Sequence, residues 1–455
     1  MSGTRDLSDA APATPSSAAD AAAFRRLALL GAATVALVIA TPFAFRAGGD
    51  NTYMAFAIAT GLVAAAATGV AERCHIARAL WFIAAVAILL RAILIVVDPF
   101  LSSDIYRYVW DGKVQAAGFN PYAFVPADDR LAALREAAIY PHINRADYAH
   151  TIYPPVAQMF FLLATRLGEN VVTMKLALVL CEAVTVAAIV LLLRRLGRPV
   201  TRIVAYAWHP LPMWEIANNG HIDGLMTALM MLGICLALFG RPVRGAIAVA
   251  LAALAKPFAV VVLPALWRPW DWKAPLAVIG VIALCYASYS SVGWGVLGFL
   301  PEGYLKEEGI LSGNYLWPLA AWRQLVGALP GDVAIYIAGV AMLTGALGLR
   351  IALRDPKSTQ AVLADINRLL LTFLALMSPN YPWYFLMATP FTALTGGAPV
   401  WTLTIAAALL QEEVTWDPYV PLLIRKTALY GAFLAACAYT IWRARRAAQQ
   451  GEAER

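Results

Sequence analysis

The stretch ALWFIAAVAILLRAILIVV (79–97) is apolar except for one arginine, and the polar, aromatic stretch SSDIYRYVWDGKVQAAGFNPY (102–122) follows it almost at once. A helix needs about 20 apolar residues to cross a bilayer. The chain of 455 residues is 61% hydrophobic and only 14% charged, whereas soluble domains carry about 25% charged residues. The sequence therefore predicts an all-α integral membrane protein, built as a polytopic helical bundle.

Apolar runs recur along the whole chain, and several of them are short. Counting them by length and composition, we expect about fourteen spans. The candidate spans lie at residues 27–45, 53–71, 78–97, 170–193, 203–217, 222–239, 244–255, 257–267, 275–295, 332–353, 361–378, 382–396, 398–412 and 421–442.

Basic loops set the expected orientation, because cytoplasmic loops of membrane proteins are rich in Lys and Arg. The segments assigned to the cytoplasm on this ground are 25–26, 71–78, 194–202, 241–244 and 443–446. The N-terminus is then inside, and a disordered tail (1–24) and a second cytoplasmic tail (443–455) flank a polytopic domain (25–442). Two larger loops (98–169 and 296–331) are external, and we expect them to carry juxtamembrane helices.

Two apolar segments depart from a simple span. YPPVAQMFFLLATRLG (153–168) is apolar for only about a dozen residues, which is typical of a helix that lies on or dips into the membrane. RGAIAVALAALAKPFAVVVLPALWR (244–268) has Lys256 and Pro257 at its centre. A lysine is costly at that depth and a proline interrupts a helix, so we expect two short helices with Lys256 at their outer tip.

Several classes of function are disfavoured. The formal charge of +7 comes from arginines in short loops, so it does not indicate a nucleic-acid partner. The chain has no G-x-x-x-x-G-K-[ST] motif and no G-x-G-x-x-G after a strand, which are the usual nucleotide signatures. Its five cysteines show no C-x-x-C spacing and predict neither a disulfide framework nor a metal site.

The stretch after the first long apolar run carries the first candidate site. Asp104 and Asp111 are seven residues apart, so on a helix both lie on one face, with Arg107 and Tyr108 on the same side. One interpretation is a carboxylate that acts as a general base while its neighbours hold a substrate. The alternative is a solvated juxtamembrane helix whose aromatic residues form an interfacial belt.

Other polar groups gather on the expected outer face. A metal site from His209, His221 and Asp223 would also suit the segment WHPLPMWEIANNGHIDGLM (208–226), although ordinary capping and turn chemistry explains it as well. Lys256 would neutralise a phosphate, or else reach to the interface. The residues that we predict to bind substrate are Arg107, Tyr108, Asn120, Tyr153, His221, Asp223, Lys256, Trp383 and Tyr384.

Five motifs in order, SSDIYRYVWDGKVQAAGFNPY, YPPVAQ, NNGHIDGLM, LAKP and NYPWYF, resemble those of the polyprenol-phosphate-sugar-dependent glycosyltransferases of the GT-C fold. The resemblance spans roughly residues 79–390 and is nearest to a bacterial mannosyltransferase-like branch, namely glycosyltransferase family 87 and the mycobacterial α-1,6-mannosyltransferase-like proteins. It implies a bacterial inner (plasma) membrane protein with an extracytoplasmic active site and Asp104 as general base. Many relatives have two adjacent acids there. Ser103 and Ile105 flank Asp104 here, so Asp111 or Asp223 would supply the second acid.

The resemblance also implies a reaction. A hexose, mannose in the nearest branch, would move with inversion from a polyprenyl-phosphate donor to a hydroxyl of a glycan or lipid acceptor. Lys256, with Arg107, would stabilise the leaving phosphate, and aromatic side chains would pack against sugar or lipid. No metal or other cofactor is implied. The competing functions are a transporter or flippase of a lipid-linked sugar, which Arg91 inside a span would suit, and a lipid-linked glycan ligase or polymerase.

Overall fold

The computed structural model describes residues 17–268, 270–355, 358–411 and 419–453, and in these ranges every regular element is helical. The α-helices are α1 Ser17–Ala71, α2 Ile76–Val96, α3 Asp104–Ala116, α4 Pro155–Thr165, α5 Val171–Arg195, α6 Val204–Ala207, α7 Asp223–Leu238, α8 Pro242–Ala253, α9 Leu263–Leu266, α10 Lys273–Ala287, α11 Leu305–Glu307, α12 Trp317–Val326, α13 Asp332–Leu353, α14 Thr359–Met377, α15 Pro390–Leu394, α16 Ala398–Ala406 and α17 Tyr419–Ala453. The short 3₁₀ and π elements are η1 Asp129–Leu134, η2 Tyr140–His142, η3 Val200–Ile203, η4 Pro212–Asn218, η5 Pro257–Val262, η6 Ser290–Leu297, η7 Leu300–Tyr304, η8 Pro382–Ala388 and η9 Ala407–Leu410.

Fewer helices than expected are long enough to cross a membrane. Among the described residues six qualify, or up to eight if each of two bent pairs counts as one span, so the expected number of about fourteen is not confirmed. The expected spans at 244–255, 257–267 and 398–412 are short apolar helices instead. A helix of twelve residues extends only about 18 Å, whereas the hydrocarbon core is about 30 Å thick. These short pieces pack inside the bundle rather than crossing alone.

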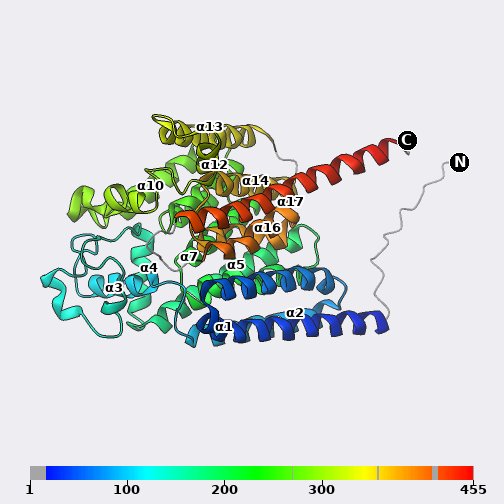
Figure 1. Ribbon diagram of the computed structural model, residues 1–455, viewed down its shortest axis with the longest axis horizontal. Helices are drawn as coiled ribbons and strands as arrows, with labels where there is room; N and C mark the ends of the chain where they lie inside the picture. The colour runs from blue at the N-terminus through cyan, green and yellow to red at the C-terminus, as the bar shows by residue number, and fades with distance from the viewer. Residues whose placement is uncertain (1–16, 269, 356–357, 412–418, 454–455) are drawn as a thin grey trace.

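The first helix is a hairpin. Gly49 has a left-handed φ of 64° that breaks α1, and Figure 1 shows the two blue arms lying alongside each other. The arms correspond to the expected spans at 27–45 and 53–71. Residues 17–24, which we expected in a disordered tail, belong to the helix because their alanines favour it. The remainder of that tail, residues 1–16, lies outside the described residues, and α17 runs on through residues 443–453 of the other tail.

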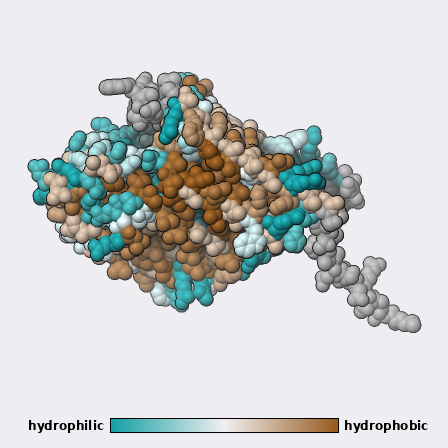
Figure 2. Space-filling model, turned by 90° about the horizontal axis from the view of Figure 1, so that it is seen from below, coloured by the Kyte–Doolittle hydropathy of each residue, from teal (hydrophilic) through white to brown (hydrophobic). Residues whose placement is uncertain are grey.

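The surface is that of a membrane protein. Figure 2 shows an apolar belt across the middle of the molecule between two more hydrophilic ends. Large apolar side chains on the long helices, such as Phe43, Trp81 and Leu180, are exposed, as expected where helices face lipid. The chain is therefore a multi-pass membrane protein.

The two ends of the bundle differ in their loops. At one end, Asp20 pairs with Arg78 at 2.6 Å, Arg202 pairs with Glu72, and Arg198 lies against the loop before α16 through a bond to the Leu394 carbonyl. These contacts gather the basic loops that the sequence assigned to one side. The other end is covered by α3, α4 and the loop between them (Figure 1).

The segment 153–168 and the Lys256 tip of the segment 244–268 both lie at this second end, as predicted. The short helix α4 packs against α3 without crossing the bundle, and α5 starts at the same end, where the Lys175 ammonium donates to the Val97 carbonyl. Lys256 lies between α8 and η5, at the tip of two short helices.

Arg91 is paired inside the bundle. Its guanidinium bonds both carboxylate oxygens of Glu182 on α5, at 2.7 and 3.3 Å, and both side chains are buried. This pair joins α2 to α5. Arg91 was the residue that best suited a transporter, and its pairing with Glu182 removes that argument because the charge has a fixed structural partner.

Candidate active site

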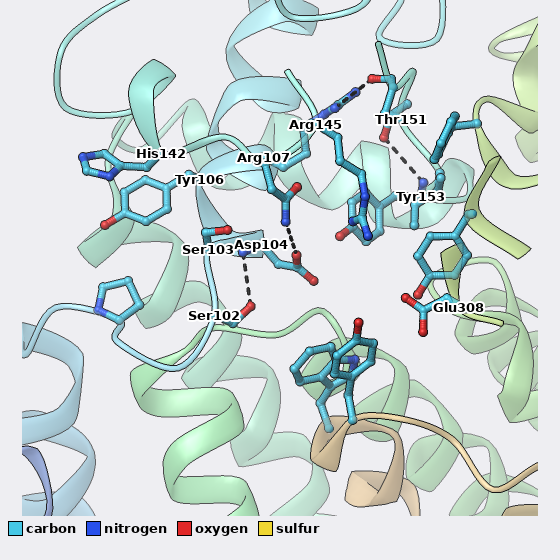
Figure 3. Close-up of a pocket in the computed structure, with 18 of the residues that line it drawn as sticks. Ser102, Ser103, Asp104, Tyr106, Arg107, His142, Arg145, Thr151, Tyr153 and Glu308 are labelled. Atoms are coloured by element: carbon cyan, nitrogen blue, oxygen red, sulfur yellow. Dashed lines mark hydrogen bonds between the residues drawn. The ribbon is translucent and has the colours of Figure 1, made fainter. Parts of the chain in front are cut away.

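A pocket of about 820 Å³ lies at the covered end of the bundle, where α3 begins. Segments far apart in the sequence form its walls (Figure 3). Its lining residues are Pro99, Phe100, Leu101, Ser102, Ser103, Asp104, Tyr106, Arg107, His142, Asn144, Arg145, Ala149, His150, Thr151, Ile152, Tyr153, Lys256, Phe299, Tyr304, Glu308, Tyr381, Trp383 and Gln411. Five of the predicted site residues, namely Asp104, Arg107, Tyr153, Lys256 and Trp383, are among them.

Asp104 occupies the first position of α3 and lines the pocket (Figure 3). The Asn144 side-chain amide donates to its carboxylate at 3.2 Å, and its backbone amide donates to the Ser102 hydroxyl at 3.3 Å. The free N–H groups at a helix N-terminus favour negative charge. The Asp104 side chain therefore lies at a helix N-terminus, accepts one hydrogen bond and is only partly covered.

Asp111 lies behind the pocket rather than in its lining. It is buried, its carboxylate accepts from the Arg107 guanidinium at 2.7 Å, and the Gln158 amide donates to its other oxygen at 2.8 Å. Arg107 also donates to the Ala149 carbonyl at 3.1 Å. Asp111, which the seven-residue spacing from Asp104 placed on a shared face, thus forms an internal i,i+4 ion pair in which it positions Arg107.

Of the predicted aromatic and amide residues of this region, some line the pocket and others lie behind it. Tyr108 is buried and stacks on Phe161 at 4.5 Å. Asn120 bonds the Ser291 hydroxyl at 2.8 Å and lies outside the lining. Tyr153 lines the pocket and packs edge-on against Tyr108 at 4.9 Å. Tyr108 and Asn120 therefore support the site without facing it.

Lys256 reaches the pocket already paired. Its ammonium donates to the Asp223 carboxylate at 2.6 Å and lies 4.2 Å from the Tyr384 ring centroid. Asp223 is fully buried, while 15% of the Lys256 side chain is exposed. Neither Asp223 nor Tyr384 lines the pocket. The predicted second acid at Asp223 is therefore the partner of Lys256.

Trp383 lies in a stack of three rings. Its ring is 4.1 Å from that of His221 and 4.4 Å from that of Tyr381. His221 is buried and contacts Glu215 at 3.0 Å. Tyr381 is the more exposed of the three, so it is the ring of this stack with most surface toward the pocket.

Several lining residues were missed by sequence reasoning. Arg145 has a left-handed φ of 55° and bonds Glu307 at 2.5 Å, which links the loop between α3 and α4 to the end of α11. Glu308, the next residue, lines the pocket with only 6% of its surface exposed. The sequence signal that could have found it is the pair of adjacent glutamates, Glu307 and Glu308.

The three strongly basic residues of the lining share a pattern. Arg107, Arg145 and Lys256 pair respectively with Asp111, Glu307 and Asp223, and none of these three acids is part of the lining. The carboxylates that do line the pocket belong to Asp104 and Glu308. The described residues of the pocket therefore include three basic side chains, each paired with an acid outside the lining, and two acids that belong to the lining themselves.

Burial shifts the titration of groups around the pocket. It raises the pKa of Glu308, a shift opposed by hydrogen bonds from Asn380 and Tyr381 and by the charge of Arg145. Burial also raises the pKa of Tyr153, to which the charge of Asp104 adds. Burial would lower the pKa of Arg145, but the charge and hydrogen bond of Glu307 raise it.

The metal set considered from the sequence does not form. His209 contacts Thr404 at 3.0 Å and stacks on Trp401, away from the pocket lining. In the described ranges no three His, Cys, Asp or Glu side chains are grouped so that they could hold a metal ion.

Curated relatives share much of this region. One is the alpha-(1->6)-mannopyranosyltransferase A of Mycobacterium tuberculosis, 26% identical over 332 residues, which cover 72% of this chain and 61% of that protein. Another is the protein of the same name from Corynebacterium glutamicum, 27% identical over 183 residues, 38% of this chain and 35% of that protein. The chain thus spans less than two thirds of the length of either relative. No solved structure matches it.

The family comparison points the same way. Residues 47–271 match the family described as alpha-(1->6)-mannopyranosyltransferase, N-terminal domain. That range includes Asp104, Arg107 and Lys256, and it ends before Glu308 and the Tyr381 stack. These matches support the resemblance drawn from the motifs: over these residues the chain is similar to the N-terminal domain of the alpha-(1->6)-mannopyranosyltransferases, that is, to the mycobacterial mannosyltransferase-like GT-C glycosyltransferases.

Proposed function

We propose that the chain is an integral-membrane mannosyltransferase that moves a mannose from a polyprenyl-phosphate donor to a hydroxyl of a glycan or lipid acceptor, with inversion. The observation that carries the proposal is Asp104, held at the N-terminus of α3 and facing a large pocket at one end of the membrane bundle. The relatives are named for α-(1→6) transfer, and we propose the same linkage here.

The reaction is a direct displacement. The acceptor hydroxyl attacks the anomeric carbon and its proton passes to the Asp104 carboxylate. A bond forms from the acceptor oxygen to that carbon, and the bond from the carbon to the phosphate oxygen breaks. A β-linked donor then gives an α-linked product. A positioned base of this kind contributes on the order of 10²–10⁴-fold to the rate.

The leaving group is a polyprenyl monophosphate, and the pocket cations suit it. Lys256 and Arg107 both line the pocket, and each is oriented by a buried carboxylate behind it. Such preorganised charge stabilises a developing anion best where water is excluded. The lipid tail would lie along the apolar belt of the molecule (Figure 2).

The basic loops support the proposed side of the membrane. They gather at the end opposite the pocket, and Lys- and Arg-rich loops are cytoplasmic. The active site would then be extracytoplasmic, with the chain in the bacterial inner membrane and its N-terminus inside.

The test is transfer from a synthetic short-chain polyprenyl-phosphate-mannose to a mannoside acceptor by the full chain in detergent. We expect the wild type to transfer mannose and Asp104→Asn to lose at least about 100-fold, because the amide cannot take the proton.

Asp129→Asn is the matched control, since Asp129 is an exposed aspartate of the same loop outside the pocket. It should transfer at the wild-type rate. Undiminished transfer by Asp104→Asn would remove Asp104 as the base, and movement of the lipid-linked sugar across vesicles without transfer would favour a flippase.

A further inference from the structure

Glu308 is a buried acid that the proposed mechanism does not use. It follows α11 in the second external segment, about two hundred residues after Asp104, and its side chain lines the same pocket. Figure 3 shows Asp104 and Glu308 on different walls of the pocket, with Arg145 between them. Both side chains belong to the lining of one pocket, so the two acids face one shared space.

A chain of polar contacts holds Glu308 in place. The Asn380 amide donates to its carboxylate at 3.0 Å and to its backbone carbonyl at 3.1 Å. The Asn380 side-chain oxygen in turn accepts from the buried Lys426 ammonium at 2.7 Å. Lys426 also donates to the carbonyls of Tyr315 and Ser378. Burying a carboxylate costs free energy unless it accepts hydrogen bonds, and Asn380 and Tyr381 donate those bonds to Glu308.

The aromatic side chains that line the pocket beside Glu308 suit the binding of a sugar. Tyr381, the least buried ring of the three-ring stack, bonds Glu308 and lines the pocket. The Tyr304 hydroxyl, bonded to that of Tyr384 at 2.8 Å, lines the same wall. Aromatic rings with a carboxylate beside them offer an apolar face and a strong acceptor for hydroxyl groups.

We propose that Glu308 is an acceptor-binding residue: its carboxylate accepts hydrogen bonds from hydroxyls of the saccharide that receives the sugar, placed against Tyr381 and opposite Asp104. This inference rests on the proposed function for the identity of that saccharide. The donor suits Glu308 less well, because its phosphate carries the same sign of charge. A neutral polyol is what a buried carboxylate binds without repulsion.

The experiment measures binding and transfer separately. Methyl α-(1→6)-dimannoside is titrated by calorimetry into the full chain in detergent, as wild type and as Glu308→Gln, which keeps the shape and the bond from Asn380. Hydrogen bonds to a charged group are the strong class, so we expect the Kd to rise roughly 10- to 100-fold. One of the single-deoxy dimannosides should lack the hydroxyl that bonds Glu308. The wild type should bind this sugar more weakly than the parent dimannoside, whereas Glu308→Gln should bind the two sugars equally.

Glu136→Gln is the matched control, because Glu136 is an exposed glutamate that pairs with Lys113 outside the pocket. Its Kd should equal that of the wild type, and all three proteins should unfold cooperatively on heating. Equal dimannoside binding by wild type and Glu308→Gln, or none by the wild type, overturns the proposal. So does unchanged binding with a lower kcat and a shifted pH profile, which would make Glu308 a base.

The two proposals fail separately. If the wild type binds dimannoside through Glu308 but transfers no mannose from the lipid donor, the proposed function is wrong and the binding role of Glu308 is supported. If transfer occurs and Glu308→Gln binds and transfers normally, the proposed function holds and the role of Glu308 is wrong.

Discussion

Single side chains of the pocket are held by partners from distant parts of the chain. Asp104 has a helix N-terminus and Asn144 to receive its charge and remains partly exposed. Glu308 is nearly covered and depends on Asn380. Burial therefore penalises the charged form of Glu308 and raises its pKa.

The raised pKa of Glu308 has a consequence for stability. A carboxyl whose pKa is higher in the folded than in the unfolded state binds its proton more tightly when folded. Its contribution to stability is full below the unfolded value of about 4.5 and is lost as pH rises through the folded value. We expect the Tm of wild type minus that of Glu308→Gln, measured in detergent, to fall as pH rises from about 4 to 8. A difference that stays constant over this range would contradict the shift, and Glu136→Gln should give a flat profile.

Contacts between elements set the position of α3, the helix that begins with Asp104. Short helices α3 and α4 meet where Gly112 lies against the backbone of α4, and a Cβ atom on Gly112 would stand 2.4 Å from the Phe161 carbonyl oxygen. This close approach sets the position of α3 and hence of Asp104. At the other wall, Lys426 ties α17 to the loop that carries Asn380.

Gly112→Ala should separate α3 from α4. Because the nearest atom belongs to the backbone, the helices must shift, and overpacking of this kind typically costs about 1–3 kcal/mol. We expect a lower Tm and reduced mannose transfer. Gly69→Ala is the control, since Gly69 is an exposed helical glycine of α1 with nothing near the added Cβ. That variant should be neutral or more stable, by up to about 1 kcal/mol. An equal response of both variants would show that the α3–α4 contact tolerates a side chain.

The whole molecule has two unlike ends separated by an apolar belt (Figure 2). One end gathers the basic loops, and the other carries the pocket. The C-terminal part of α17 projects at the basic end (Figure 1). This polarity fits one orientation in the membrane, with the basic end in the cytoplasm.

Single cysteines would report the orientation. In a chain whose five cysteines are replaced by alanine, Asp129→Cys marks the pocket end and Gln449→Cys marks the basic end, both at exposed positions. A membrane-impermeant maleimide should label Asp129→Cys in spheroplasts and Gln449→Cys only after the membrane is opened. The reverse pattern would invert the orientation, and labelling at both positions in closed spheroplasts would show leakage or mixed insertion.

Local sequence by itself determined the helical class, the membrane character, the short helices at 153–168 and around Lys256, and the gathering of the basic loops. Apolar length, proline and loop charge act within one segment, so they can be read along the chain. The span count failed because short apolar helices packed inside the bundle have the composition of spans.

Only the tertiary structure decided which polar groups face the pocket. Asp111 and Asp223 are buried and pair with Arg107 and Lys256. Glu308 lines the pocket although it lies about two hundred residues after Asp104 in the sequence. A buried charge settles against whichever partner satisfies it, and that partner is chosen by packing rather than by spacing in the sequence. The experiments above test the roles that we propose for these side chains.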